Sequence, residues 1–147
     1  MATRVNIKKL DERAVVPTYG SEFSAGADLY AVLDGPVVLQ PGETKLIPTG
    51  LAMEIPVGYA GLIYARSGLA SKKGLAPANK VGVVDADYRG EVMVPLHNHS
   101  TVAATVECGE RIAQLVIAPF LQADFRTVEQ LEETQRGAGG FGSTGTK

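Results

Sequence analysis

Turn-forming residues interrupt this sequence so often that few apolar stretches extend beyond the length of a short β-strand. The clearest turn signals are Asp34-Gly35-Pro36, Pro41-Gly42, Thr49-Gly50, Pro56-Val57-Gly58 and Arg89-Gly90. Around them we expect strands at residues 5–10, 37–40, 44–48, 51–55, 59–65, 81–84, 91–97, 102–106 and 111–120. Short strands that recur about every 8–12 residues are typical of an all-β sandwich or barrel.

Helical signals are sparse. We expect a single short helix over residues 67–73, and Gly74 follows it as a stop signal. A doubly wound α/β fold would need several longer helices between its strands, and the sequence offers none. The expected fold class is therefore all-β with one short helix.

Length and composition limit the class of protein further. A chain of 147 residues has room for one domain of ordinary size. With 45% hydrophobic and 20% charged residues, it does not resemble a disordered chain, a coiled coil or a collagen. The net charge of −2 argues against a broad nucleic-acid surface. The apolar runs are far shorter than the roughly 18 residues of a membrane span. We expect binding to neither nucleic acid nor membrane.

The sequence also bears on location. No apolar stretch follows the charges near the N-terminus, so no signal peptide is visible. Cys108 is the only cysteine and cannot form an intramolecular disulfide, which fits a reducing compartment. A cytoplasmic location is expected, with the nucleus or an organelle left open.

Glycine is concentrated at the C-terminal end. The chain has 17 glycines, and five of them lie in residues 135–147. Such a segment buries too little to offset its ordering entropy, so we expect residues 1–134 to form the domain and residues 135–147 a mobile arm. A frayed terminus is the simpler interpretation, but Arg136 and Phe141 favour a functional arm.

Two short patterns in the sequence are discounted. Gly137, Gly139 and Gly142 match the spacing of a dinucleotide fingerprint, but the strand and helix that give this motif its meaning are missing. His97 and His99 would lie on one face of a strand, yet no third ligand is suitably spaced. Two surface histidines are therefore favoured over a metal site.

Arg66-Ser67-Gly68 combines a guanidinium, a hydroxyl and exposed backbone N–H groups at the start of the expected helix. Together these groups favour an anion such as phosphate. Ordinary helix capping by Ser67 is the alternative, and it leaves Arg66 unexplained.

Asp85 directly follows an expected buried strand, Gly82-Val83-Val84, and Asp87 comes two residues later. A carboxylate held by a rigid strand suits a general base. Paired carboxylates are also common turn formers, so the residues alone leave catalysis and turn formation equally open. Asp85 is the better candidate base, because turn formation accounts for Asp87.

Five segments in order resemble the five motifs of trimeric dUTP pyrophosphatases (dUTPases), from about Ala25 to Gly145. They are residues 25–30 (AGADLY), 65–70 (ARSGLA), 82–90 (GVVDADYRG), 109–115 (GERIAQL) and 136–145 (RGAGGFGSTG). One departure is Ala65, where the family commonly has proline.

The resemblance implies a jelly-roll β-barrel that forms a homotrimer with active sites at subunit interfaces. It implies hydrolysis of dUTP to dUMP and pyrophosphate with Mg²⁺, which limits uracil in DNA and supplies dUMP for thymidylate synthesis. Asp85 would be the general base that activates water for attack at the α-phosphorus, and Asp28 would lie near the metal, reached through water.

The resemblance also implies residues that bind the nucleotide. Uracil would be read by Asn79 and the backbone of Val83, Val84 and Met93, while Tyr88 would exclude a 2′-hydroxyl. The phosphates would be held by Arg66, Ser67, Gly68 and Gln114. The arm would close over a site on another subunit, with Phe141 on uracil and Arg136, Gly142, Ser143 and Thr144 on the remaining substrate.

Two alternatives compete with this interpretation. A dCTP deaminase of related fold would release ammonia first, but the Asp85–Gly90 turn and the glycine-rich arm favour a dUTPase. A non-catalytic β-barrel that senses nucleotide would need neither Asp85 nor the arm.

Overall fold

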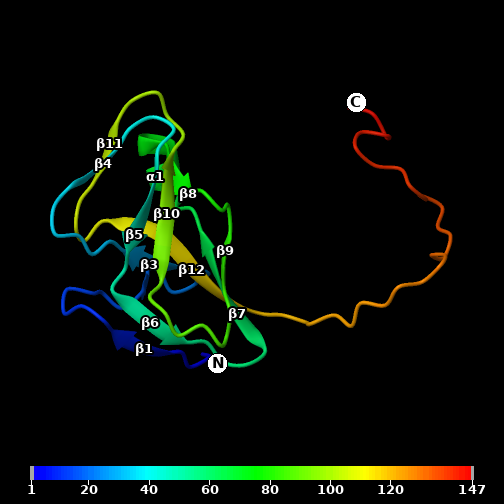
Figure 1. The fold of residues 1–147 in the computed structure, drawn as a ribbon, viewed down its shortest axis with the longest axis horizontal. Coiled ribbons are helices and arrows are strands. Elements are labelled where there is room, and N and C mark those ends of the chain that lie inside the picture. Colours follow the sequence, from blue (N-terminus) through cyan, green and yellow to red (C-terminus); the bar gives the residue numbers. More distant parts are fainter. Residues whose placement is uncertain (1, 147) are drawn as a thin grey trace.

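Twelve short strands and one helix make up residues 2–146, the part of the chain that the computed structural model describes. The strands are β1 (Asn6–Lys9), β2 (Thr18–Tyr19), β3 (Ala27–Tyr30), β4 (Val37–Leu39), β5 (Thr44–Pro48), β6 (Leu51–Glu54), β7 (Tyr59–Tyr64), β8 (Leu75–Pro77), β9 (Gly82–Val84), β10 (Met93–Asn98), β11 (Ala104–Val106) and β12 (Arg111–Pro119). The helix is α1 (Ser67–Lys73). Figure 1 shows a strand-built body from which the C-terminal segment extends. The expected all-β class with one short helix is confirmed.

The strands pair antiparallel in four sheets. The largest has the order β2-β3-β12-β7-β9, and a second has the order β5-β10-β8. Two-stranded pairs, β1 with β6 and β4 with β11, complete the body. Strand β12 lies between β3 and β7, so the largest sheet brings together segments from the beginning, middle and end of the barrel sequence.

The core lies between these sheets. Strand β10 alternates in burial, with Val94, Leu96 and Asn98 inward and Met93 exposed. The buried Asn98 donates from Nδ2 to the carbonyls of Leu39 (2.9 Å) and Val102 (2.8 Å). Its Oδ1 accepts from the backbone N–H of Ser100 at 2.9 Å. These bonds satisfy a buried amide that would otherwise destabilise the fold.

Helix α1 covers one end of the body. It occupies the expected residues and ends at Gly74, whose φ of 67° is left-handed and whose N–H donates to Ala70 O. Leu69 is its buried anchor. Lys73 in the last turn donates to Thr105 O at 2.9 Å, which ties the helix to β11.

The strand predictions were right in place but incomplete. Residues 44–48 form a strand with the expected bounds, and the other eight expected strands differ by one or two residues at one or both ends. The largest differences are in residues 91–97, which become Met93–Asn98, and residues 102–106, which begin at Ala104. Strands β2, β3 and β8 were not expected. Strand β3 has a carboxylate at its second position, which obscured its pattern. Strand β8 contains Pro77, which is tolerated because β8 lies at the edge of its sheet.

After Pro119 the chain leaves the body. Residues 121–138 are exposed and contain no strand or helix, and Figure 1 shows them projecting away. Several of their side chains are large and apolar, among them Leu121, Phe125 and Leu131. The division at residues 134 and 135 into a domain and a mobile arm stays a prediction. Within the described residues, no helix is long and apolar enough to cross a bilayer.

Candidate functional site

A hollow of about 370 Å³ lies between β9 and β10. Its walls include six of the expected site residues: Asn79, Val83, Val84, Asp85, Tyr88 and Met93. Leu46, Ile63, Glu91, Val92 and Pro95 also contribute. Strand β9 is held by β7 on one side, and it forms the end of its sheet on the other. The hollow is therefore bordered by a strand edge that has no neighbouring strand within residues 2–146.

Asp85 lies at the rim of this hollow. It is exposed and follows the last residue of β9, and its backbone carbonyl accepts from Tyr88 N–H at 3.1 Å. Its carboxylate oxygens make no hydrogen bond or ion pair within residues 2–146. Asp85 thus starts a turn through its backbone while its carboxylate stays free to accept a proton. Turn formation and a role as a general base, the two interpretations of Asp85 that the sequence left open, are therefore compatible.

Tyr88 lies close to Asp85 in the same hollow. Its side chain is half exposed, and its hydroxyl donates to the backbone carbonyl of Glu91 at 2.7 Å. This hydrogen bond holds the ring across Gly90.

A second hollow of about 350 Å³ contains Asp28, Arg66, Ser67 and Gln114, all expected site residues. Gly20, Ser24, Ala25, Gly26 and Arg111 complete its walls. Strand pairing explains the grouping, because Gln114 on β12 lies opposite Asp28 on one side and Tyr64 on the other. The Gln114 amide donates to Ala65 O at 2.8 Å, next to Arg66.

Asp28 is buried, and its carboxylate pairs with two arginines. Arg66 Nε donates to Asp28 Oδ1 at 2.8 Å, and Arg111 Nη1 lies 3.6 Å from Asp28 Oδ2. Two guanidinium groups against one carboxylate leave this hollow with a net positive charge. Such a hollow suits an anion.

The structure excludes the alternative role of Ser67 as a helix cap. Capping by Ser67 was the alternative to an anion role, but Arg66 occupies the N-cap position, and no side chain caps the helix. Ser67 is the first helical residue and is exposed. Its hydroxyl is therefore available to a ligand, as is the backbone at Gly68.

The two hollows lie apart in one chain. Val84 pairs with Gly61, and Arg66 lies five residues further along β7 and the segment after it. The hollows share no wall residue, and none of the expected arm residues lines either one. Phe141 is fully exposed. The structure thus groups the expected residues in two places and leaves the arm separate.

Sequence reasoning missed Arg111 as a site residue. Arg111 and Gln114 would face opposite sides of a regular strand. A register shift between Arg111 and Ala113 places both around one hollow. No local sequence signal predicts this register shift in β12. The motifs include Gly26 and Gly90, but the sequence did not predict that Gly26 lies against the Gln114 side chain and Gly90 against the Tyr88 ring.

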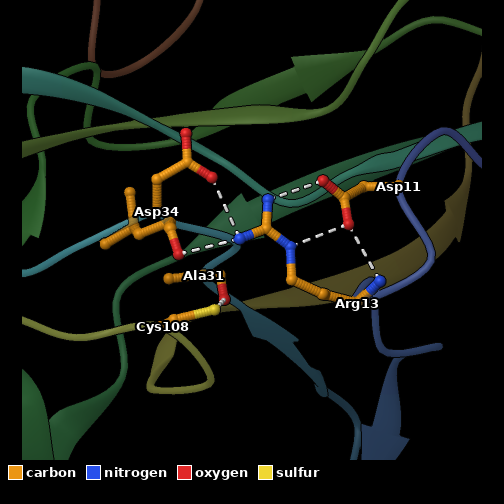
Figure 2. A network of polar contacts seen from close by, with 6 residues as sticks. Asp11, Arg13, Ala31, Asp34 and Cys108 are labelled. Atoms are coloured by element: carbon orange, nitrogen blue, oxygen red, sulfur yellow. Dashed lines mark hydrogen bonds and ion pairs between the residues drawn. The ribbon is translucent and has the colours of Figure 1, made fainter.

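A separate polar network fixes the segment between β1 and β2 (Figure 2). Arg13 binds Asp11 Oδ2 at 2.8 Å, Asp34 Oδ1 at 3.0 Å and Leu33 O at 3.2 Å. Hydrogen bonds from the Arg13 side chain and backbone lower the pKa of Asp11 to about 2. Cys108 lies nearby, with Sγ 3.7 Å from Ala31 O. Every charge of this network has a partner, so it braces the loops.

His97 and His99 lie side by side, with ring centroids 4.5 Å apart. His97 Nδ1 forms a 2.7 Å hydrogen bond with Thr44 Oγ1. Partial desolvation of the exposed His99 ring, and then the charges of His97 and Lys80, lower its pKa. No group of three metal-binding side chains occurs in the described part of the chain.

Comparison with known proteins agrees with this geometry. A family model described as dUTPase matches residues 12–145. A protein of Nautilia profundicola named deoxyuridine 5'-triphosphate nucleotidohydrolase is 52% identical over 142 residues, covering 97% of this chain and 99% of that protein. A protein of the same name from Neisseria meningitidis serogroup B is 52% identical over 149 residues, covering 99% of both.

Solved structures match over nearly the same length. A mutant dUTPase of Staphylococcus bacteriophage 80alpha, solved with dUpNHpp, superposes with a TM-score of 0.89 and 31% identity, covering 99% of this chain and 100% of that one. A mutant dUTPase of Staphylococcus aureus phage phi11, described with a structural Mg(II) ion, has a TM-score of 0.79 and 27% identity, covering 89% and 100%. From the match across residues 12–145 and the close relatives, the chain belongs to the dUTPase family.

Proposed function

We propose that this protein hydrolyses dUTP to dUMP and pyrophosphate. One observation carries the proposal: the hollow between β9 and β10 brings together the residues expected to read uracil and places a free carboxylate, that of Asp85, at its rim. The names of the relatives support the same reaction. In the cell, this activity would limit uracil in DNA and supply dUMP for thymidylate synthesis.

Uracil is read by the free edge of β9. Because β9 ends its sheet, alternate N–H and C=O groups on its outer edge have no strand partner and can bond a base edge. Val83, Val84, Met93 and the Asn79 side chain line that edge. A narrow hollow rejects the 5-methyl group of thymine by volume. Cytosine is penalised because its amino group leaves buried polar groups unpaired.

Asp85 is the general base. It accepts a proton from water as the water oxygen bonds to the α-phosphorus, and the bond from that phosphorus to the bridging oxygen of the β-phosphate breaks. Pyrophosphate leaves and dUMP remains. A carboxylate with no other partner suits this role, because nothing competes for its lone pairs.

The second hollow holds the phosphates. Arg66, Ser67, Gly68 and Gln114 supply donors, and Asp28 holds the Arg66 guanidinium in place at 2.8 Å. Displacement at phosphorus depends mostly on positioning and charge stabilisation, so fixed donors contribute directly to rate.

The donor set of this hollow fits a Mg²⁺ ion held mainly by the substrate. Among the described residues, Asp28 is the only carboxylate in its wall, and both of its oxygens face arginines. Mg²⁺ commonly keeps several waters and takes phosphate oxygens, so Asp28 would reach it through water. Bound there, the ion would neutralise developing phosphate charge.

A homotrimer with shared sites accounts for the separation of the hollows. Asp85 lines one hollow and Arg66 lines the other, and the two hollows share no wall residue. A site between subunits can unite the base of one with the phosphate hollow of another. The exposed apolar residues Leu121, Phe125 and Leu131 would be covered by a partner. The arm would then close on a partner's site, with Phe141 on uracil and Arg136, Gly142, Ser143 and Thr144 on the rest of the substrate.

One assay tests the reaction: pyrophosphate and ammonia release with Mg²⁺ from dUTP, dTTP, dCTP and UTP in parallel. We expect pyrophosphate from dUTP alone. Ammonia from dCTP would identify a deaminase, and nucleotide binding without either product would identify a sensor.

Asp85→Asn tests the base. Turnover should fall about 10²–10⁴-fold while nucleotide still binds, the range for a lost general base. The matched control is Asp87→Asn, an exposed carboxylate two residues away that lies outside the hollow between β9 and β10. An equal loss in both variants would argue against a specific role for Asp85.

A further inference from the structure

The ring of Tyr88 occupies the space that a side chain at position 90 would need. A Cβ atom added to Gly90 would lie 2.5 Å from the Tyr88 hydroxyl oxygen, 2.7 Å from Cζ and 2.9 Å from Cε1. Non-bonded carbon atoms pack at about 3.5–4.0 Å, so this overlap cannot persist. The ring therefore lies directly on the glycine.

The backbone at Gly90 does not itself require glycine. Its φ lies outside the left-handed region, where glycine is favoured, unlike those of Gly58 and Gly74. The nearest obstacles to a side chain are all atoms of Tyr88. Glycine at position 90 is thus required by the packing of the Tyr88 ring and not by the backbone conformation of the turn.

Two hydrogen bonds hold Tyr88 on this surface. Its hydroxyl donates to Glu91 O at 2.7 Å, and its backbone N–H donates to Asp85 O at 3.1 Å. The ring is about half exposed, at 45%, and lines the same hollow as Asp85. Tyr88 is therefore fixed at both ends in the absence of ligand, which lowers the entropy that binding must overcome.

We propose that Gly90 is a positioning residue for Tyr88, and that the exclusion of a 2′-hydroxyl already expected of Tyr88 depends on the docking of its ring on this glycine. The inference rests on the proposed dUTP hydrolysis. Because the Tyr88 ring is held on Gly90 and Glu91, it cannot move away from the sugar. The 2′-hydroxyl of a ribose would therefore clash with the ring. A methyl group at position 90 would displace the Tyr88 ring from Gly90. The displaced ring would then leave room for the 2′-hydroxyl of a ribose.

Gly90→Ala tests the proposal. The ratio of kcat/KM for dUTP to that for UTP should fall about tenfold, the scale of losing one close steric contact. The fold should persist, because the obstructing atoms belong to the movable end of an exposed side chain. Gly35→Ala is the matched control, since nothing lies within 4 Å of a Cβ at that exposed turn. An unchanged ratio in Gly90→Ala would overturn the proposal.

A double-mutant cycle separates positioning from other effects of the methyl group. In a Tyr88→Ala background no ring is present, so adding Gly90→Ala should change the dUTP/UTP ratio no further. An equal fall in both backgrounds would overturn the positioning role. Tyr88→Phe, which keeps the ring but loses the bond to Glu91 O, should lie between the wild type and Tyr88→Ala.

A readout independent of activity separates this inference from the proposed function. Isotope labelling of tyrosine allows the Tyr88 ring to be followed by NMR in the free protein, with Tyr88→Phe used for assignment. Gly90→Ala should shift the Tyr88 resonance and leave the other four tyrosines in place. Failure of the wild type to hydrolyse dUTP would reject the proposed function, while an unmoved ring would reject the positioning role.

Discussion

At the scale of single residues, Asp28 is the one charged residue that the fold buries within residues 2–146. It was expected near a metal because of the family resemblance. Its observed partners are the guanidinium groups of Arg66 and Arg111. A carboxylate between two arginines orients both, so Asp28 fixes the positions of the guanidinium donors around this hollow. The proposed contact with Mg²⁺ through water would be additional.

Asp28→Asn should lower the free energy of unfolding by about 1.5–3 kcal/mol, the range for a hydrogen bond to a charged group. Urea unfolding measures this loss. The control is Asp34→Asn, whose carboxylate pairs with Arg13 but is 97% exposed. A solvent-exposed pair contributes about 1 kcal/mol or less. Equal losses in the two variants would show that burial of Asp28 does not strengthen its pairing.

His99 should titrate below the ordinary histidine value of 6.5. Partial desolvation of this exposed ring disfavours its charged form, and the charges of His97 and Lys80 act in the same direction. The unfolded chain therefore binds this proton more readily, so stability falls as pH drops through about 6.5 and is retained above it. NMR titration is direct, since the chain has only two histidines.

Lys80→Gln provides the control for His99. Removing this positive charge should raise the pKa of His99 part of the way toward 6.5, with the desolvation effect remaining. A His99 pKa at or above 6.5 in the wild type would contradict the electrostatic account.

At the scale of elements, the end of α1 at Gly74 depends both on a local stop signal and on a tertiary contact with Ser100. Gly74 was expected to stop the helix, and its φ of 67° is one that L-residues adopt at a cost. A Cβ there would also lie 2.7 Å from Ser100 Cβ and 3.1 Å from Ser100 N. The helix end is thus packed against the loop that Asn98 and Ser100 organise after β10.

Gly74→Ala should lower the free energy of unfolding by at least about 1 kcal/mol, from the left-handed conformation alone. The contact with Ser100 backbone adds to this loss. Chemical denaturation gives the value, and Gly35→Ala serves as the control, expected to be neutral or stabilising by about 0.4–1 kcal/mol. Similar stabilities for the two variants would exclude the cap and its contact as sources of stability.

At the scale of the whole molecule, the hollow around Asp28 and Arg66, the hollow between β9 and β10, and the arm lie in three places. The apolar residues between Pro119 and the arm are exposed in the single chain. Both facts follow if the functional unit is an oligomer, in which each site takes groups from more than one subunit. The fold of one subunit then provides parts of several sites.

Truncation after Thr134 should leave a folded oligomer that hydrolyses dUTP poorly. We expect kcat/KM to fall more than about tenfold, or about 1.4 kcal/mol of transition-state stabilisation. Light scattering would confirm the oligomer and steady-state kinetics the loss. A chain that ends at Gly145 keeps all residues of the arm motif and should match the full-length protein. Full activity after truncation at Thr134 would reject the role of the arm.

Local sequence signals predicted much of the fold and the candidate site. Helix α1 and its glycine stop were right to the residue, and nine expected strands are present in place. These features depend on neighbours along the chain: turn residues, a helix stop and the alternation of apolar side chains. The grouping of Asn79, Val83, Asp85 and Tyr88 around one hollow also agrees with the expectation, since all four lie within residues 79–88.

The sequence by itself determined the β-rich class, the turns, the short helix and the residues of each motif, because all of these depend on short-range chemistry. Only the tertiary structure decided that β3 is a strand, because β12 supplies its partner from more than 80 residues away. It also decided that a register shift brings Arg111 to Asp28, and that the Tyr88 ring rests on Gly90. These features depend on long-range pairing and on the directions of side chains, which no local pattern of residues records.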